Sequence, residues 1–159
     1  MLAVRVLQAY RFALDPSPRA ERALAEGAAL ERFRRMVAAQ GGDPRVADDP
    51  WAVLPRAPVV LPIEAEASGT LAAVEAEEIG RASVDLGAGR RRKGDPVHPA
   101  VGIVFHPKVG DRVERGEPVG EVHARDEDAA RAAARRVLGA LRLSDGPVAP
   151  PPLVHGWFG

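Results

Sequence analysis

The sequence predicts an α+β protein in which helices precede a domain with a small mixed sheet and helices on one face of that sheet. Three observations support this prediction. Apolar residues recur at helical spacing before Gly41, a polar segment rich in proline and aspartate follows, and from Pro58 onward short apolar runs alternate with amphipathic stretches. The pattern divides the chain into a helical segment (1–42), a linker (43–57), an α+β domain (58–146) and a proline-rich tail (147–159).

The helical segment is expected to hold two helices. The opening run MLAVRVLQAYRFAL contains arginines and lacks a cleavage-site pattern, which favours a helix over a signal sequence. A second helix is predicted over residues 19–40, with Leu30, Phe33 and Val37 on one face. A glycine pair ends this helix, because glycine accepts the left-handed conformation found at helix ends. The linker that follows contains several Pro and Asp residues, which interrupt both helices and central strands.

The first half of the domain is predicted to contain two strands and a helix. The extended runs VVLPIE and TLAAVEA flank a turn at Ser68 and Gly69. A helix follows, because acidic residues precede an apolar face that includes Ile79 and Leu86, and Gly87 suits its end.

The second half is predicted to contain two longer strands, a helix and a short final strand. The strands are AVGIVFH (100–106) and PVGEVHA (118–124), and tight turns at Gly110 and Gly116 lie between them. The helix begins near Asp126, and LRLSD forms the last strand. The apolar face of this helix consists of Ala130, Ala134, Val137, Leu138 and Leu141.

The composition limits the possible functions. Basic and acidic residues balance at 22 each, so the long-range field of a general nucleic-acid-binding protein is absent. There is no cysteine, which excludes disulfides, thiol nucleophiles and thiolate metal sites, and the cytoplasm is the expected location. The four histidines lack the spacing of a metal site, and the serines lack a nucleophile-elbow context. We expect no metal and no self-contained catalytic site.

The candidate functional site is the basic run in LGAGRRRKGDP, which consists of Arg90, Arg91, Arg92 and Lys93. It follows the negative end of a predicted helix, whereas phosphate usually binds at a helix N-terminus. Two interpretations remain open: a solvated run that compensates the helix end, or a loop that borders an active cleft. Nucleic-acid binding is disfavoured because no aromatic residues are interleaved for base stacking.

Four blocks of sequence, in order, resemble the C-terminal part of the pyrimidine-nucleoside phosphorylases, the thymidine phosphorylase family. They are ALERFRRMVAAQGGDPRV, LGAGRRRKGDPVHPAVGI, KVGDRVERGEPVGEVHARDE and APPPLV. The third block alone also resembles carrier domains, but Lys93 and Lys108 do not stand in the context of a modified lysine. The resemblance implies an α/β-hammerhead fold for the domain.

The resemblance also implies a function. Enzymes of this family cleave pyrimidine nucleosides such as thymidine or uridine with inorganic phosphate, which gives the free base and a pentose 1-phosphate. They need no cofactor beyond phosphate as co-substrate, and the full enzyme is expected to be a homodimer. The family's phosphate- and base-binding motifs have no counterpart here, so we expect this chain to be inactive without a catalytic portion as its partner. Arg90 to Lys93 would then serve as a lid over the substrate cleft or as an interdomain latch.

A second hypothesis is a non-enzymatic module that binds a partner protein or a small anion. Neither hypothesis involves nucleic acid or a membrane. An upstream segment with the glycine-rich phosphate motif would distinguish the first hypothesis from the second.

Overall fold

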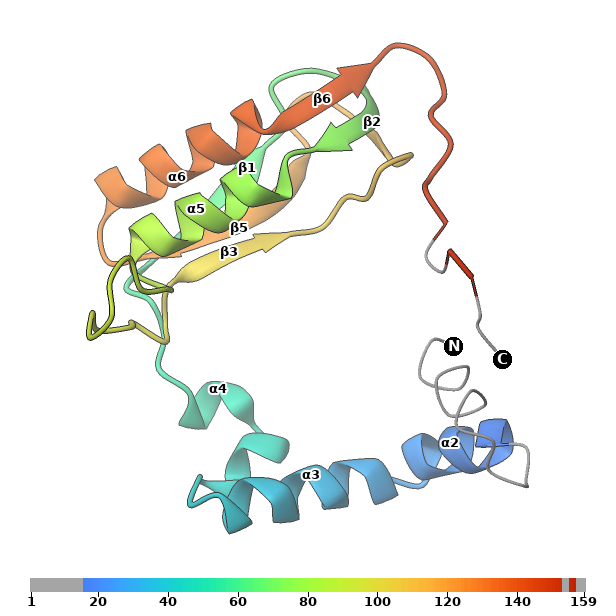
Figure 1. Cartoon of the computed structure of the whole chain (residues 1–159), viewed down its shortest axis with the longest axis vertical. Helices are drawn as coiled ribbons and strands as arrows, with labels where there is room; N and C mark the ends of the chain where they lie inside the picture. The colour runs from blue at the N-terminus through green and yellow to red at the C-terminus, as the bar shows by residue number, and fades with distance from the viewer. Residues whose placement is uncertain (1–15, 153–154, 157–159) are drawn as a thin grey trace. The chain divides into compact units, whose positions relative to one another are not determined.

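The structure is a computed structural model that describes residues 16–152 and 155–156 (Figure 1). The chain divides into two compact units. The first ends at Leu54, and we call its described residues 16–54 the helical unit; the second, Pro55–Pro152, is the α+β unit. The opening helix predicted from MLAVRVLQAYRFAL lies outside the described residues.

The helical unit contains α2 (Pro16–Ala25) and α3 (Ala28–Ala39). The single helix predicted over residues 19–40 is therefore wrong. Gly27 adopts a left-handed φ of 77° between the two helices, a conformation that breaks the helical path and that glycine adopts without steric cost.

The stretch predicted as a linker also contains short helices, η1 (Pro44–Ala47) and α4 (Pro50–Val53). The Asp43 carboxylate accepts a hydrogen bond from the N–H of Arg45, and the Asp49 carboxylate accepts one from the N–H of Ala52. Each aspartate is followed directly by proline, a residue suited to the first helical position. The Asp-Pro pairs that suggested irregular chain therefore act as helix starts.

The α+β unit contains two three-stranded sheets. In the first, β5 (Pro118–Ala124) lies between β1 (Val59–Glu64) and β3 (Gly102–Phe105). In the second, β2 (Gly69–Val74) lies between β4 (Arg112–Val113) and β6 (Leu141–Ser144).

The predicted α+β class is confirmed, but the strand arrangement needs correction. Every described pairing is antiparallel and the strands form two sheets, in place of one small mixed sheet. Strands β1 and β2, adjacent in sequence, belong to different sheets. Strand β4 was not predicted, because its two residues are too few to show an alternating pattern.

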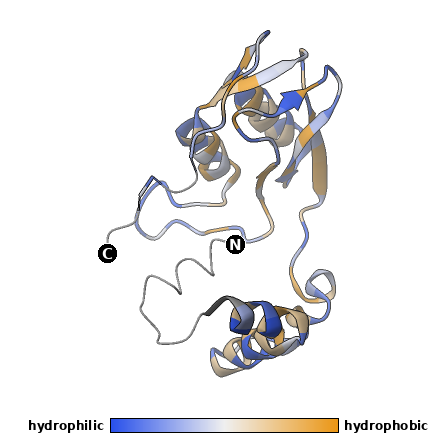
Figure 2. Ribbon diagram, turned by 90° about the vertical axis from the view of Figure 1, so that its right-hand side faces the viewer, coloured by the Kyte–Doolittle hydropathy of each residue, from blue (hydrophilic) through white to orange (hydrophobic). Residues whose placement is uncertain are grey.

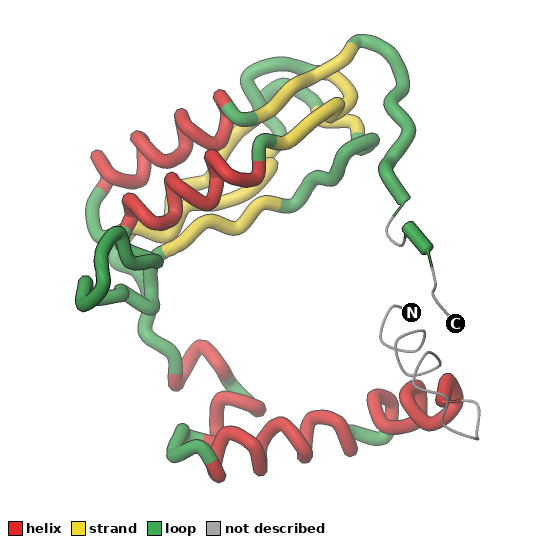
Figure 3. The backbone as a smooth tube through the Cα atoms, viewed as in Figure 1, coloured by secondary structure: helices red, strands yellow, loops and turns green. Residues whose placement is uncertain are grey.

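Helices α5 (Ala76–Leu86) and α6 (Glu127–Gly139) lie side by side over one face of the β1–β5–β3 sheet, as predicted (Figures 1 and 3). Gly87 ends α5 with a φ of 102°, and Asp126 begins α6 by accepting the N–H of Ala129 at 2.8 Å. The core between helices and sheet is apolar and includes Ile63, Leu86, Val101, Val122, Ala130 and Val137. Among the described residues, no helix has both the length and the apolarity needed to cross a bilayer.

Candidate functional site

The basic run lies in the connection between α5 and β3. The two ends of this connection meet, because the N–H of His98 donates to the carbonyl oxygen of Gly87 at 2.9 Å. A Cβ atom on Gly87 would lie 2.8 Å from Cδ2 of His98, so the glycine is required both by its positive φ and by this close approach. The result is a closed loop with a fixed base.

Asp95 shapes the tip of the loop. Its Oδ2 atom accepts the backbone N–H groups of Arg91 at 3.1 Å and Arg92 at 2.8 Å. Its own N–H donates to the carbonyl oxygen of Arg92 at 3.2 Å, and Gly94 turns the chain with a φ of 94°. Arg90 adds a contact from its Nε to the carbonyl oxygen of Asp95 at 3.2 Å. The loop is therefore ordered by its own hydrogen bonds.

Asp85, near the end of α5, ties the loop to both helices. Its Oδ1 atom accepts Nε–H of Arg91 at 3.0 Å, and its Oδ2 atom accepts Nη1–H of Arg136 from α6. Arg136 also pairs with Glu78 at 3.3 Å. The hydrogen bond from Arg91, with a further contribution from Arg136, lowers the pKa of the Asp85 carboxyl. Asp85 therefore stays ionised and holds two guanidinium groups at neutral pH.

The four predicted site residues fall into two classes. The side chain of Arg90 donates a hydrogen bond within the loop, and that of Arg91 donates one to Asp85 of α5. The side chains of Arg92 and Lys93 are exposed and make no hydrogen bond or ion pair with any residue that the structure describes. Two of the four cations therefore remain exposed at the surface of the α+β unit.

Sequence reasoning missed the residues that organise this loop. Asp85 stands six positions before Arg91 and Asp95 stands four after it, so an acid on each side of the basic run was the available signal. No such signal existed for Arg136, which is 51 positions from Asp85.

The histidines do not form a site. The backbone N–H of His106 bonds to Val119, whereas His123 lies opposite Gly102 at the other end of the same strand pair, so the two side chains are not brought together. Nε2 of His123 lies 2.8 Å from a carboxylate oxygen of Glu121. No group of metal-ligating side chains occurs among residues 16–152 and 155–156.

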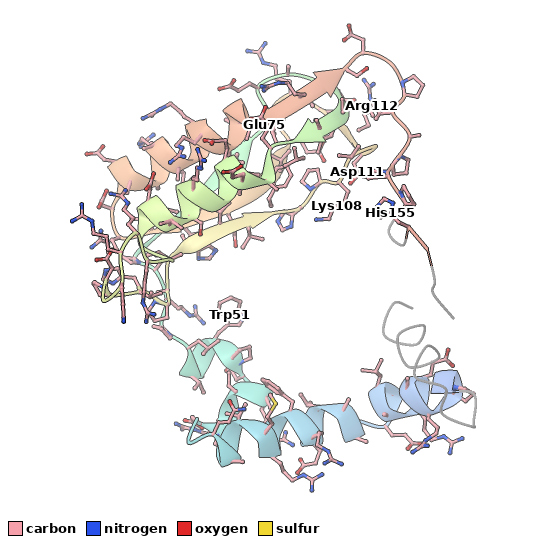
Figure 4. All side chains as sticks on the ribbon, in the orientation of Figure 1. Trp51, Glu75, Lys108, Asp111, Arg112 and His155 are labelled. Atoms are coloured by element: carbon pink, nitrogen blue, oxygen red, sulfur yellow. The ribbon has the colours of Figure 1, made fainter. Side chains whose placement is uncertain are left out.

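The turn before β4 has the structural role expected from its sequence. The Asp111 carboxylate accepts the backbone N–H of Lys108 at 2.7 Å, and both residues are marked in Figure 4. Gly110 adopts a φ of 99° at this turn. Asp111 is therefore engaged in holding the turn.

A cavity of about 140 Å³ lies between the two sheets. Leu71, Phe105 and Val119 are among its mostly apolar walls, and Glu66 is the charged residue that lines it. Because no cation lines the cavity, it is poorly suited to a phosphate group.

Residues 70–144, which include the basic loop and Asp85, match the family described as the pyrimidine nucleoside phosphorylase C-terminal domain. These residues belong to that family. The matched stretch runs from β2 to the end of β6 and contains the basic run together with Asp85, Asp95 and Arg136.

Whole-protein relatives agree with this assignment. The chain is 45% identical over 133 residues to the thymidine phosphorylase of Burkholderia orbicola strain MC0-3, which is 84% of this chain and 30% of the relative. It is 38% identical over 154 residues to that of Sinorhizobium medicae, which is 97% of this chain and 35% of the relative. It is 39% identical over 126 residues to that of Agrobacterium fabrum, which is 79% of this chain and 29% of the relative. The chain thus spans about a third of the length of these phosphorylases.

Proposed function

We propose that this chain is the C-terminal module of a pyrimidine-nucleoside phosphorylase and is inactive without the catalytic portion. The completed enzyme cleaves thymidine or uridine with inorganic phosphate to give the base and pentose 1-phosphate. The observation that carries the proposal is the match of residues 70–144 to the phosphorylase C-terminal domain, together with similarity to the thymidine phosphorylases described above. The proposal includes a cytoplasmic homodimer that requires no cofactor and binds neither nucleic acid nor membrane.

Within this function, the loop Arg90–Lys93 acts as a lid on the substrate cleft or as a latch between domains. Arg92 and Lys93 make the contact, because their side chains have no partner among the described residues. Their targets are anionic: substrate phosphate, or a carboxylate of the catalytic portion.

Arg91 and Asp95 support this contact without making it. Asp95 fixes the backbone of the loop tip, and Arg91 fastens the loop to Asp85. A loop that is already ordered loses less conformational entropy when it closes on a partner. Closure of such elements often limits turnover, so the two free cations act on the closing step.

The test measures phosphate-dependent release of thymine and uracil. The chain is assayed alone and mixed with a separately produced catalytic portion of the Burkholderia orbicola thymidine phosphorylase. We expect no activity from the chain alone and restored activity in the mixture. Activity of the chain alone would refute the proposal that the catalytic residues lie in the other portion. An inactive mixture would favour a non-enzymatic module that binds a partner or an anion.

The lid or latch is tested in the same mixture with the double variant Arg92→Ser/Lys93→Ser. Losing one charge-assisted hydrogen bond should lower kcat/KM by about tenfold, which corresponds to about 1.4 kcal/mol. The matched control is Arg125→Ser/Arg135→Ser, which removes two positive charges from exposed positions. Equal kinetics for the two double variants would refute the assignment of the contact to Arg92 and Lys93.

A further inference from the structure

The helical unit has no interior of its own. None of the residues 18–54 is buried. Its two longest helices have 10 and 12 residues, lengths at which isolated helices are marginal in water. Helices of this length are stabilised mainly by packing of an apolar face, so this unit needs a surface on which to pack.

That face is a stripe along α3, which we define as Ala29, Leu30, Phe33, Met36 and Val37. At 100° per residue these positions cover an arc of roughly 120°, the width that a helix presents to a protein core. Leu30 is 46% exposed, Phe33 41% and Met36 48%. Figure 2 shows hydrophobic and hydrophilic residues side by side on the helices of this unit.

The remainder of the helical unit covers only one edge of the stripe. Gly42 approaches Val37 so closely that a Cβ atom there would lie 2.8 Å from Cγ1 of Val37. Arg34, adjacent to this edge, pairs with Glu31 and with Asp48, the residue that ends η1. Phe33 lies in the middle of the stripe and Met36 at its other edge, and both side chains are exposed.

The relatives indicate what covers the stripe. The match to the Sinorhizobium medicae phosphorylase covers 97% of this chain. Too few residues remain outside the match for α3 to be among them, so α3 belongs to the matched sequence. The stripe is therefore part of the sequence shared with proteins about three times as long. Within this shared sequence, the helical unit is the part in which none of the residues 18–54 is buried.

We propose that the α3 stripe is the surface on which the catalytic portion of the phosphorylase docks. This inference rests on the proposed function and adds a second attachment, separate from the basic loop. Leu30, Phe33 and Val37 stand at positions i, i+3 and i+7, the spacing of anchors on a helix that lies in an apolar groove. Phe33 is the central anchor, because large aromatic side chains dominate such contacts.

The experiment measures binding of the full chain to the separately produced catalytic portion of the Burkholderia orbicola enzyme by isothermal titration calorimetry. Phe33→Glu places a charge in the stripe, and Ala38→Glu places the same charge on the opposite side of α3. We expect Ala38→Glu to bind like the unmodified chain and Phe33→Glu to bind at least tenfold more weakly. Phe33→Ala, which keeps a strong helix former, should also weaken binding. Circular dichroism reports whether the variants keep equal helix content.

Several results would overturn the inference. If Phe33→Glu and Phe33→Ala bind like the unmodified chain, docking occurs elsewhere. If the unmodified chain self-associates in sedimentation velocity and Phe33→Glu does not, a second copy covers the stripe. If the mixture is active and the Phe33 variants bind as tightly as the unmodified chain, the docking inference is wrong and the proposed function stands. If binding depends on Phe33 but the mixture is inactive, the proposed function is wrong and the docking inference stands. If the unmodified chain does not bind the catalytic portion, both are wrong.

Discussion

Gly120 is the position where a single added methyl group should do the most damage to the phosphorylase domain. It lies in β5, the central strand of its sheet, opposite Phe105 of β3. A Cβ atom at Gly120 would lie 2.2 Å from the carbonyl oxygen of Val104 and 3.2 Å from Cα of Phe105. Both are backbone atoms of β3, so no change of side-chain rotamer relieves the overlap.

The expected loss of stability for Gly120→Ala follows from this geometry. Strand β3 must move until the contact widens from 2.2 Å to the 3.4 Å of an ordinary contact. Overpacking of this kind costs about 1–3 kcal/mol. The shift also strains the adjacent bond from the N–H of His106 to Val119, now 3.0 Å long, and such a bond is worth about 1 kcal/mol. We therefore expect the free energy of unfolding to fall by about 3 kcal/mol, or Tm by roughly 12–24 °C for a domain of this size.

Gly102→Ala is the matched control, because Gly102 lies in β3 of the same strand pair. A Cβ atom there meets nothing within 4 Å, and Gly102 is not among the glycines with positive φ. The free energy of unfolding of Gly102→Ala should stay within about 1 kcal/mol of that of the unmodified chain, and any change should be an increase. Urea and thermal unfolding followed by circular dichroism measure both variants. A loss below about 1 kcal/mol for Gly120→Ala, or equal losses for both variants, would refute the steric argument.

Two further predictions concern charged residues. Asp126→Ala removes the carboxylate that accepts the N–H of Ala129 at the start of α6, and urea unfolding should show a loss of about 1 kcal/mol, most of which Asp126→Asn restores. Asp85 has a pKa below its usual 3.8 in the folded chain, so its ion pairs stabilise the fold above about pH 4, and this stability is lost as the pH falls through the folded-state pKa. Asp85→Asn should therefore be less stable than the unmodified chain at pH 7, with a smaller difference near pH 2, and 0.5 M salt should reduce the difference at pH 7. A difference between Asp85→Asn and the unmodified chain that is the same at both pH values would contradict the role given to this carboxylate.

Elements whose signals are local could be predicted from the sequence. Helix α6 begins after Asp126 and strand β5 spans Pro118–Ala124, both where the sequence placed them. The side chain of Asp126 and the apolar alternation of β5 act within a few residues, so a single sequence displays them.

The division of the strands into two sheets depends on contacts between residues that are far apart in the chain. The turn at Ser68 was interpreted as joining two neighbouring strands, yet the Ser68 Oγ accepts the N–H of Arg115, 47 residues away. Gly69 then pairs with Val113 in the second sheet. Such long-range partners leave no periodic signal, which explains why two sheets were predicted as one.

The candidate site shows the same division between local and distant information. The sequence placed four cations directly after a helix, and the structure has them there. It did not show that Asp85 and Asp95 engage Arg91 and the loop backbone, nor that Arg136 reaches Asp85 from α6. Two of the four side chains in the basic run are therefore engaged in contacts within the α+β unit, and two are exposed.

Arg91 pairs with Asp85 and Arg90 donates to the carbonyl oxygen of Asp95, whereas the side chains of Arg92 and Lys93 have no partner among the described residues. Asp85 of α5 holds both Arg91 of the loop and Arg136 of α6, so these contacts connect the loop to the two helices. Both helices pack on the sheet that contains β5. A flexible solvated run would lose entropy on every closure, whereas this loop has its backbone fixed in advance by Asp95. The proposed latch and a solvated charge run predict different kinetics, and Arg92→Ser/Lys93→Ser measured against Arg125→Ser/Arg135→Ser separates these two interpretations.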